Sequence, residues 1–225
     1  MVGIIVSGGA NNQVLKSVEI IREDGTICTL PDMQVNRGSH SQAGWVICGG
    51  ADDAAQNTCT TFEDGAWVES HDLSKGRKDH LSWRTSTGDI ILMGGTSAPT
   101  IRSTELLSHT SSANTQPFPL AYNTRYQHKN NYTADNYKSK MCRKACGIAV
   151  PETDHIVITG GQIGNANSNS KNGGTNRVQV YNTFGEVSAT TFPNLNQSRF
   201  QHACGFYYDN LGQMVSNVMS GHLYQ

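Results

Sequence analysis

The sequence predicts an all-β fold assembled from a repeated antiparallel unit. An apolar run that ends in a Gly-Gly pair occurs four times along the 225 residues. Glycine is abundant, with 23 residues, and only 16% of the residues are charged. Few charges together with many Gly, Ser, Thr and Asn residues favour short strands joined by turns over long helices.

The four apolar runs share one layout and almost one spacing. They cover residues 4–9, 45–50, 90–95 and 156–161. Their first glycines are 41, 45 and 66 residues apart, and the last interval fits one repeat plus an insertion. Each run is too short and too β-branched for a helix, so it predicts a buried strand. Glycine is expected where the chain leaves such a strand with positive φ, or where a neighbouring backbone passes close by. The glycines assigned this structural role are Gly8, Gly9, Gly49, Gly50, Gly94, Gly95, Gly160 and Gly161.

Each Gly-Gly pair is followed by a polar loop and a second strand. These second strands are predicted at residues 17–21, 59–62, 104–107 and 178–181. Asp24-Gly25 and Asp64-Gly65 then predict tight hairpins into a third strand. A bulky or apolar residue follows the hairpin, and it is Ile27, Trp67 or Val187.

An Arg-x-x-His element opens the following unit. It is found at Arg37 and His40, Arg77 and His80, Arg125 and His128, and Arg199 and His202. A catalytic interpretation would use the histidine as a base and the arginine as an anion clamp. A structural interpretation has both side chains join neighbouring units through hydrogen bonds. The element recurs in every unit, as a structural need does, so we expect the structural role.

The order of these elements resembles the kelch repeat, whose period is about 50 residues. The resemblance covers roughly residues 3–208 and implies an all-β propeller of four-stranded antiparallel blades, in one domain over residues 1–210. The usual tyrosine stands only at Tyr181 and the usual tryptophan only at Trp67. The implied blades are roughly 1–35, 36–76, 77–121 and 142–195, with a partial blade at 196–210, an insertion at 122–141 and a degenerate tail at 211–225.

Two interpretations of the chain ends remain open. The last predicted strand, 203–208, could complete the first blade and close a four-bladed ring. Alternatively, the chain is a piece of a larger propeller. The second interpretation is favoured because residues 213–225 look unlike a repeat.

The six cysteines indicate an oxidising compartment if they pair. Cys48 ends one predicted strand and Cys59 begins its partner, so we expect a disulfide between them. Cys146 and Cys204 hold equivalent places in consecutive units, where a disulfide and a buried free thiol both remain open. Cys142 and Cys146 are spaced too widely for a zinc knuckle.

An extracellular location is further indicated by glycosylation sequons at Asn131 and Asn196. The resemblance to secreted invertebrate kelch proteins agrees with this, and a cytoplasmic location is the alternative. The first residues have no basic flank or cleavage-like end, so they do not predict a signal peptide.

Charge and motifs exclude several classes of partner. A formal net charge of -1 offers no electrostatic footprint for nucleic acid. No apolar stretch approaches the roughly 20 residues of a membrane-spanning helix. No phosphate loop or dinucleotide motif is present, so no cofactor is expected. A copper site would need clustered His and Tyr ligands. No metal is expected, because the histidines outside the repeated element are scattered at His71, His109, His155 and His222.

The sequence therefore predicts a non-catalytic module that binds a protein or glycan partner. In antiparallel blades, the loops after Gly-Gly and those before Arg-x-x-His emerge on one face. The binding residues expected on this face are Asp52, Asp53, Arg102, Tyr122, Arg125 and Tyr126. The resemblance also allows an intracellular substrate adaptor of a ubiquitin ligase. An enzyme similar to galactose oxidase or sialic-acid mutarotase is a third hypothesis.

Overall fold

The computed structural model describes most of the first half of the chain and shorter stretches of the second half. The described residues are 3–22, 24–85, 87–97, 104–108, 116–117, 146–150, 153, 155–161, 176, 178–182, 193–199, 203–208 and 214–219. These residues form β-strands and no helix. The all-β class predicted from composition and turn residues is therefore confirmed.

The strands form five antiparallel sheets, which we number in chain order. Sheet 1 contains β1 (Gly3–Ser7), β2 (Val18–Arg22) and β3 (Ile27–Leu30). Sheet 2 contains β4 (Ser41–Ala43), β5 (Val46–Cys48), β6 (Thr58–Glu63) and β7 (Ala66–Asp72). Sheet 3 contains β8 (Leu81–Arg84), β9 (Ile90–Met93), β10 (Thr104–Leu107) and β11 (Gln116–Pro117). Sheet 4 contains β12 (Cys146–Val150), β13 (His155–Thr159) and β14 (Val178–Asn182). Sheet 5 contains β15 (Ala203–Tyr208) and β16 (Met214–Met219).

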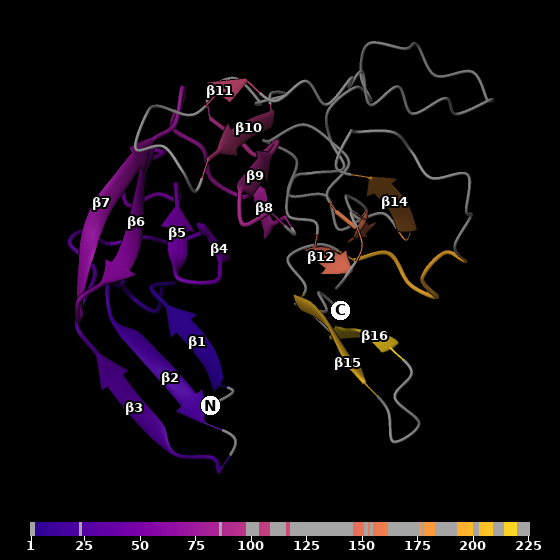
Figure 1. Ribbon diagram of the computed structural model, residues 1–225, viewed down its shortest axis with the longest axis horizontal. Coiled ribbons are helices and arrows are strands. Elements are labelled where there is room, and N and C mark those ends of the chain that lie inside the picture. Colours follow the sequence, from indigo (N-terminus) through magenta and orange to yellow (C-terminus); the bar gives the residue numbers. More distant parts are fainter. Residues whose placement is uncertain are drawn as a thin grey trace.

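The sheets follow one another along an arc, with sheet 1 and sheet 5 at its two ends (Figure 1). The first strands of sheets 2 to 5 contact one another in chain order, β4 with β8, β8 with β12, and β12 with β15. Within each sheet, strands that follow one another in the sequence are neighbours. The arrangement thus brings each sheet against the next one in the sequence.

One register recurs in four sheets. Ser41 pairs with Cys48, Leu81 with Met93, and Cys146 with Thr159, and each partner directly precedes a Gly-Gly pair. In sheet 5, Ala203 pairs with Met219, which precedes Ser220-Gly221. β16 therefore holds the same position as β5, β9 and β13, although residues 211–225 were expected to lie outside the repeat.

The pairing of β15 bears on the two interpretations of the chain ends. β15 pairs with β16, and β1 pairs with β2. Among the described strands, β15 is therefore not the strand that completes sheet 1. Sheet 1 has three strands, and it lacks a counterpart of β4 and β8 within the described residues.

The core lies between the sheets, because alternate residues of a strand point to opposite faces. Ile47 of β5 packs with Val18 and Met33 toward sheet 1. The next residue, Cys48, packs with Ile90 and Leu92 of sheet 3. The pattern repeats one sheet later, where Ile91 and Met93 pack with Ile156 and Ile158 of sheet 4.

Candidate functional site

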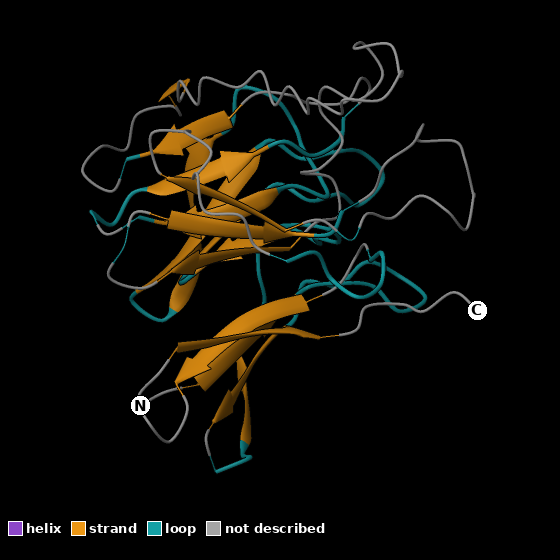
Figure 2. Cartoon of the chain, turned by 90° about the vertical axis from the view of Figure 1, so that its right-hand side faces the viewer, coloured by secondary structure: helices purple, strands orange, loops and turns teal. Residues whose placement is uncertain are grey.

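The Gly-Gly loops and the Arg-x-x-His elements lie at the same end of the sheets, which we call the loop end. Short backbone bridges join Gly38 to Ala51 and Lys78 to Thr96 at this end. The tight turns at Gly44, Gly65 and Gly88 close the opposite end, which we call the hairpin end. In Figure 2 the loops of the loop end lie on the right-hand side of the strands.

One backbone hydrogen bond recurs between consecutive units at the loop end. The second glycine of a pair donates its N–H to the carbonyl of the next Arg-x-x-His arginine. The bond joins Gly9 to Arg37 at 2.9 Å, Gly50 to Arg77 at 2.8 Å and Gly161 to Arg199 at 2.8 Å. The partner expected for Gly95, Arg125, lies outside the described residues.

The geometry of Gly49 and Gly50 explains why glycine is required there. Their φ angles are +59° and +92°, in the region that L side chains rarely adopt. A Cβ atom on Gly49 would also collide with the Arg77 carbonyl, and one on Gly50 would lie 2.9 Å from the Gly38 carbonyl. The other six glycines of the four pairs have positive φ as well.

Arg37 is fully buried and binds backbone and hydroxyl oxygens of its own sheet. Nη1 donates to the carbonyls of Gly49 and Thr58 at 2.8 and 2.9 Å, and Nη2 donates to Thr58 Oγ1 at 2.7 Å. Burial lowers the pKa of Arg37 to about 10, with a smaller opposing effect of Glu69. The guanidinium is therefore charged at neutral pH and is committed to internal contacts.

Arg77 repeats this role and adds a buried ion pair. Nη1 donates to the Gly94 carbonyl at 3.0 Å, and Nη2 binds the carboxylate of Glu105. Glu105 is 2% exposed and also accepts the backbone N–H of Ser74 at 2.8 Å. Burial lowers the pKa of Arg77, and Glu105 opposes that shift. Sequence reasoning missed Glu105; a lone acidic residue within the apolar stretch 104–107 was the available signal.

His40 and His80 connect consecutive sheets. His40 Nε2 lies 2.9 Å from Ser7 Oγ, and His80 Nε2 lies 2.7 Å from Ser41 Oγ. Burial is the main cause that lowers both pKa values, and that of His80 falls to about 3 with further contributions from Arg77 and His40. His80 is therefore neutral near pH 7. These contacts support the structural interpretation of the element; His202 and His128 lie outside the described residues.

The disulfide predicted between Cys48 and Cys59 is confirmed. It joins the paired strands β5 and β6, and both cysteines are buried against sheet 3. Cys146 is also disulfide-bonded, to a partner outside the described side chains. Cys28 is a free thiol. Disulfides of this kind are typical of oxidising compartments.

Of the six residues predicted to bind a partner, the structure describes two. Asp52 and Asp53 are exposed on the loop that follows Gly50. Asn36 Nδ2 donates to Asp52 Oδ2 at 3.2 Å, and Gln56 Nε2 donates to the Asn36 carbonyl at 2.8 Å. The loop is therefore tied to the segment before Arg37. The remaining four, Arg102, Tyr122, Arg125 and Tyr126, lie outside the described residues.

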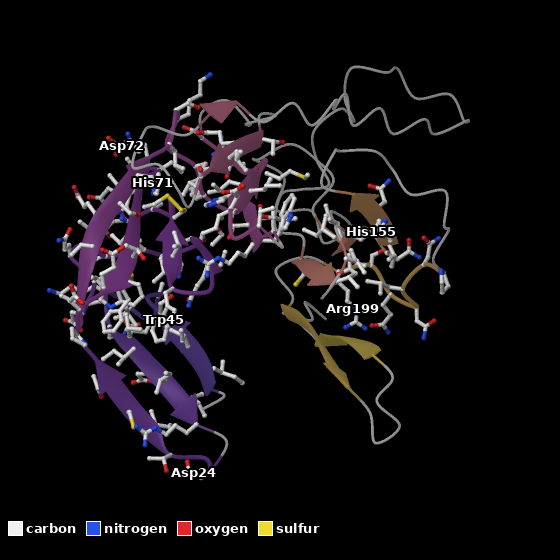
Figure 3. The ribbon with its side chains drawn as sticks, in the orientation of Figure 1. Asp24, Trp45, His71, Asp72, His155 and Arg199 are labelled. Atoms are coloured by element: carbon white, nitrogen blue, oxygen red, sulfur yellow. A yellow bond between two sulfur atoms is a disulfide. The ribbon has the colours of Figure 1, made fainter. Side chains whose placement is uncertain are left out.

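An exposed aromatic residue, Trp45, was not singled out from the sequence as a surface feature. It lies at the hairpin end, is 40% exposed, and is labelled in Figure 3. Its ring stacks on Phe62 with centroids 5.3 Å apart, and Phe62 contacts Trp67 at 5.1 Å. Two buried or half-buried aromatics thus hold one exposed ring in place, at the end opposite to Asp52.

The histidines outside the repeated element lie on different sheets where they are described. His71 is in β7 of sheet 2 and His155 is in β13 of sheet 4 (Figure 3). Within the described part of the chain, no three His, Cys, Asp or Glu side chains are grouped so that they could hold a metal ion. The same residues contain no helix long and apolar enough to cross a membrane.

No protein-family model matches the chain, and no curated protein was found to be similar.

Proposed function

We propose that the chain is a kelch-type propeller module that binds a partner without catalysing a reaction. The observation that carries the proposal is the repeated use of the same groups for internal contacts. The Gly-to-Arg backbone bond occurs three times, and the guanidiniums of Arg37 and Arg77 are buried in the bonds described above. The Arg-x-x-His element, which a catalytic interpretation would use, therefore joins the sheets. The exposed loops are the part of the surface that can bind a partner.

The proposed binding surface is the loop end, around Asp52 and Asp53. Exposed carboxylates accept hydrogen bonds from sugar hydroxyls and from arginine or lysine side chains of a protein. Asn36 and Gln56 hold the loop, which lowers the entropy lost when a partner binds. We expect Arg102, Tyr122, Arg125 and Tyr126 to extend this surface, since Arg and Tyr are enriched at interaction hot spots.

We further propose that the module is extracellular. The buried Cys48–Cys59 disulfide and the bonded Cys146 favour an oxidising compartment. Asn196 of the second sequon is exposed, as a glycosylation site must be. These features weigh against the intracellular adaptor, whose cysteines would remain reduced.

A binding screen tests the proposal. The purified chain is applied to a glycan array and to a library of displayed extracellular domains. Against any partner found, the D52A/D53A and R125A/Y126A variants should lose at least about tenfold in affinity. Glu63→Ala, an exposed carboxylate at the hairpin end, is the matched control and should bind like the wild type.

Two results would contradict the proposal. Full affinity in both loop-end variants would place the binding surface elsewhere. Turnover of a screened glycan by the wild type would contradict the non-catalytic role. Thermal unfolding of each variant, with an unchanged midpoint, shows that a loss of affinity is not a loss of folding.

A further inference from the structure

Arg37 carries a buried positive charge that no buried carboxylate balances within the described residues. The side chain is fully buried, and its Nη atoms bind only carbonyl and hydroxyl oxygens. Its Nε has no hydrogen-bond partner in the described part of the chain. Glu69 is exposed, and no ion pair joins it to Arg37 among the described side chains. A buried charge without a counter-charge is costly, so the site calls for a negative group.

The equivalent arginine of the next unit has such a group. Arg77 binds the buried carboxylate of Glu105, which lies opposite Leu92 in the register of β9 and β10. In sheet 2, Thr60 lies opposite Ile47 in the register of β5 and β6. Leu92 and Ile47 both stand two residues before a Gly-Gly pair. Thr60 therefore holds the position of Glu105, and it has no charge.

A backbone donor also recurs at this position. The N–H of Ser74, three residues before the arginine of its unit, donates to the Glu105 carboxylate at 2.8 Å. Gln34 stands three residues before Arg37, and its N–H donates to no acceptor within the described residues. The residue before each of them donates its own N–H to the segment that precedes the second strand of its sheet. The backbone thus follows the same course in both units, but in the first one the carboxylate is missing.

The hydroxyl of Thr60 adds a third donor without an acceptor. Thr60 is fully buried, and its Oγ1 has no hydrogen-bond partner in the part of the chain that the structure describes. A hydroxyl can donate a hydrogen bond, as can Arg37 Nε and the N–H of Gln34. Buried polar groups without a protein partner are commonly satisfied by an ordered water or ion. Three donors around a guanidinium favour an anion over a water molecule.

We propose that a chloride ion takes, in sheet 2, the position that the Glu105 carboxylate takes in sheet 3. Arg37, Thr60 and the backbone N–H of Gln34 bind it. Threonine is shorter than glutamate, so the side chain leaves this position to a separate anion. The full burial of Arg37 and Thr60 restricts the occupant to a small monovalent ion, because a larger or polyvalent anion loses more hydration on entry. The ion stabilises the packing of sheet 1 on sheet 2 and does not rest on the proposed partner binding.

Thermal unfolding in chloride tests the site. Sodium gluconate is replaced stepwise by sodium chloride at constant ionic strength, so that the screening of surface charges stays the same. Chloride binds only the folded protein in this proposal, so each tenfold increase above the dissociation constant should raise the melting temperature by about 3–6 °C. Sodium bromide should act in the same way, since bromide is also small and monovalent. A melting temperature that does not depend on chloride would overturn the proposal and assign the position to water.

A glutamate at position 60 should replace the ion. Thr60→Glu supplies the carboxylate within the chain, as Glu105 does, so its melting temperature should no longer depend on chloride. Ile27→Glu is the matched control, because it adds the same carboxylate at a 61% exposed position in β3. It should keep the chloride dependence of the wild type. Undiminished chloride dependence in a folded T60E variant would show that chloride acts elsewhere, and the proposed site would be wrong.

A diffraction experiment on the wild type covers the case in which T60E does not fold. Crystals grown in sodium bromide should show an anomalous peak beside Arg37 and Thr60. Peaks confined to surface residues would mean an adventitious ion only and would contradict the proposal. The D52A/D53A variant should keep the chloride dependence, so failure of this proposal and failure of the binding function are distinguishable.

Discussion

At the residue scale, the ion pair of Arg77 and Glu105 bears on stability and not on binding, because both side chains are buried. Both side chains are removed from water, and each satisfies the charge of the other. Breaking such a pair leaves an uncompensated buried charge, whereas replacing both partners with apolar residues is often tolerated.

We expect Glu105→Gln to lower the free energy of unfolding by about 3–5 kcal/mol. The double variant R77M/E105L should recover part of that loss, because it leaves no charge in the site. Urea denaturation followed by circular dichroism measures both values. Equal stability of E105Q and the wild type would show that the pair contributes little.

The pKa of His80 gives the protein a defined acid sensitivity. The folded pKa of about 3 is below the ordinary value of 6.5, because burial disfavours the imidazolium. The stability linked to this group is therefore complete above pH 6.5 and is lost as the pH falls toward 3. His80→Gln should flatten the decline of the melting temperature over this window. A parallel decline in the variant and the wild type would assign the acid sensitivity to other groups.

At the element scale, the first glycine of the pair that follows β5 is hard to replace. We compare Gly49→Ala with Gly65→Ala, since both glycines have positive φ. A Cβ on Gly65 meets nothing within 4 Å, so only the conformational cost of about 1–2 kcal/mol applies. Gly49→Ala adds a collision with the Arg77 carbonyl and should be clearly more destabilising in thermal unfolding. Equal losses would mean that the neighbouring sheet moves aside easily.

Much of the element structure could be predicted from the sequence because it depends on local signals. The apolar runs, the Asp-Gly turns and the pairing of Cys48 with Cys59 all follow from residue type and spacing. β16 was missed because Ser220-Gly221 replaces the Gly-Gly pair and Asn217 interrupts the apolar run. Its place is set instead by the register with β15, which is a contact between strands and not a property of either one alone.

The candidate site was less predictable than the sheets. Asp52 and Asp53 are exposed on a loop that the sequence predicted to be polar. The hydrogen bonds of Asn36 and Gln56, however, join this loop to the segment before Arg37, and strands β4 and β5 lie between the two in the sequence. The burial of Glu105 likewise depends on the arginine of another element. Such partners follow from the three-dimensional arrangement, and a single sequence without its fold does not specify them.

At the scale of the whole molecule, cysteine pairing tests the proposed compartment. Cys48, Cys59 and Cys146 are bonded and Cys28 is free among the described cysteines, so two disulfides account for four of the six cysteines of the chain. Thiol titration of the denatured, unreduced protein should therefore find two free thiols, and all six cysteines should react after reduction. Six free thiols before reduction would contradict the extracellular location, and Cys28→Ser provides the control because it removes a single reactive group.

The bond from Gly50 to Arg77 has a consequence for how the chain unfolds. This bond and its counterparts at Gly9 and Gly161 connect only consecutive units, so each unit is supported by its immediate neighbours. In such a quasi-linear array, the stability is a sum of unit terms and nearest-neighbour coupling terms. Weakening one coupling then divides the array into two cooperative blocks that melt separately. A variant that breaks one of these Gly-to-Arg bonds should therefore unfold in more than one thermal transition, and not merely at a lower melting temperature.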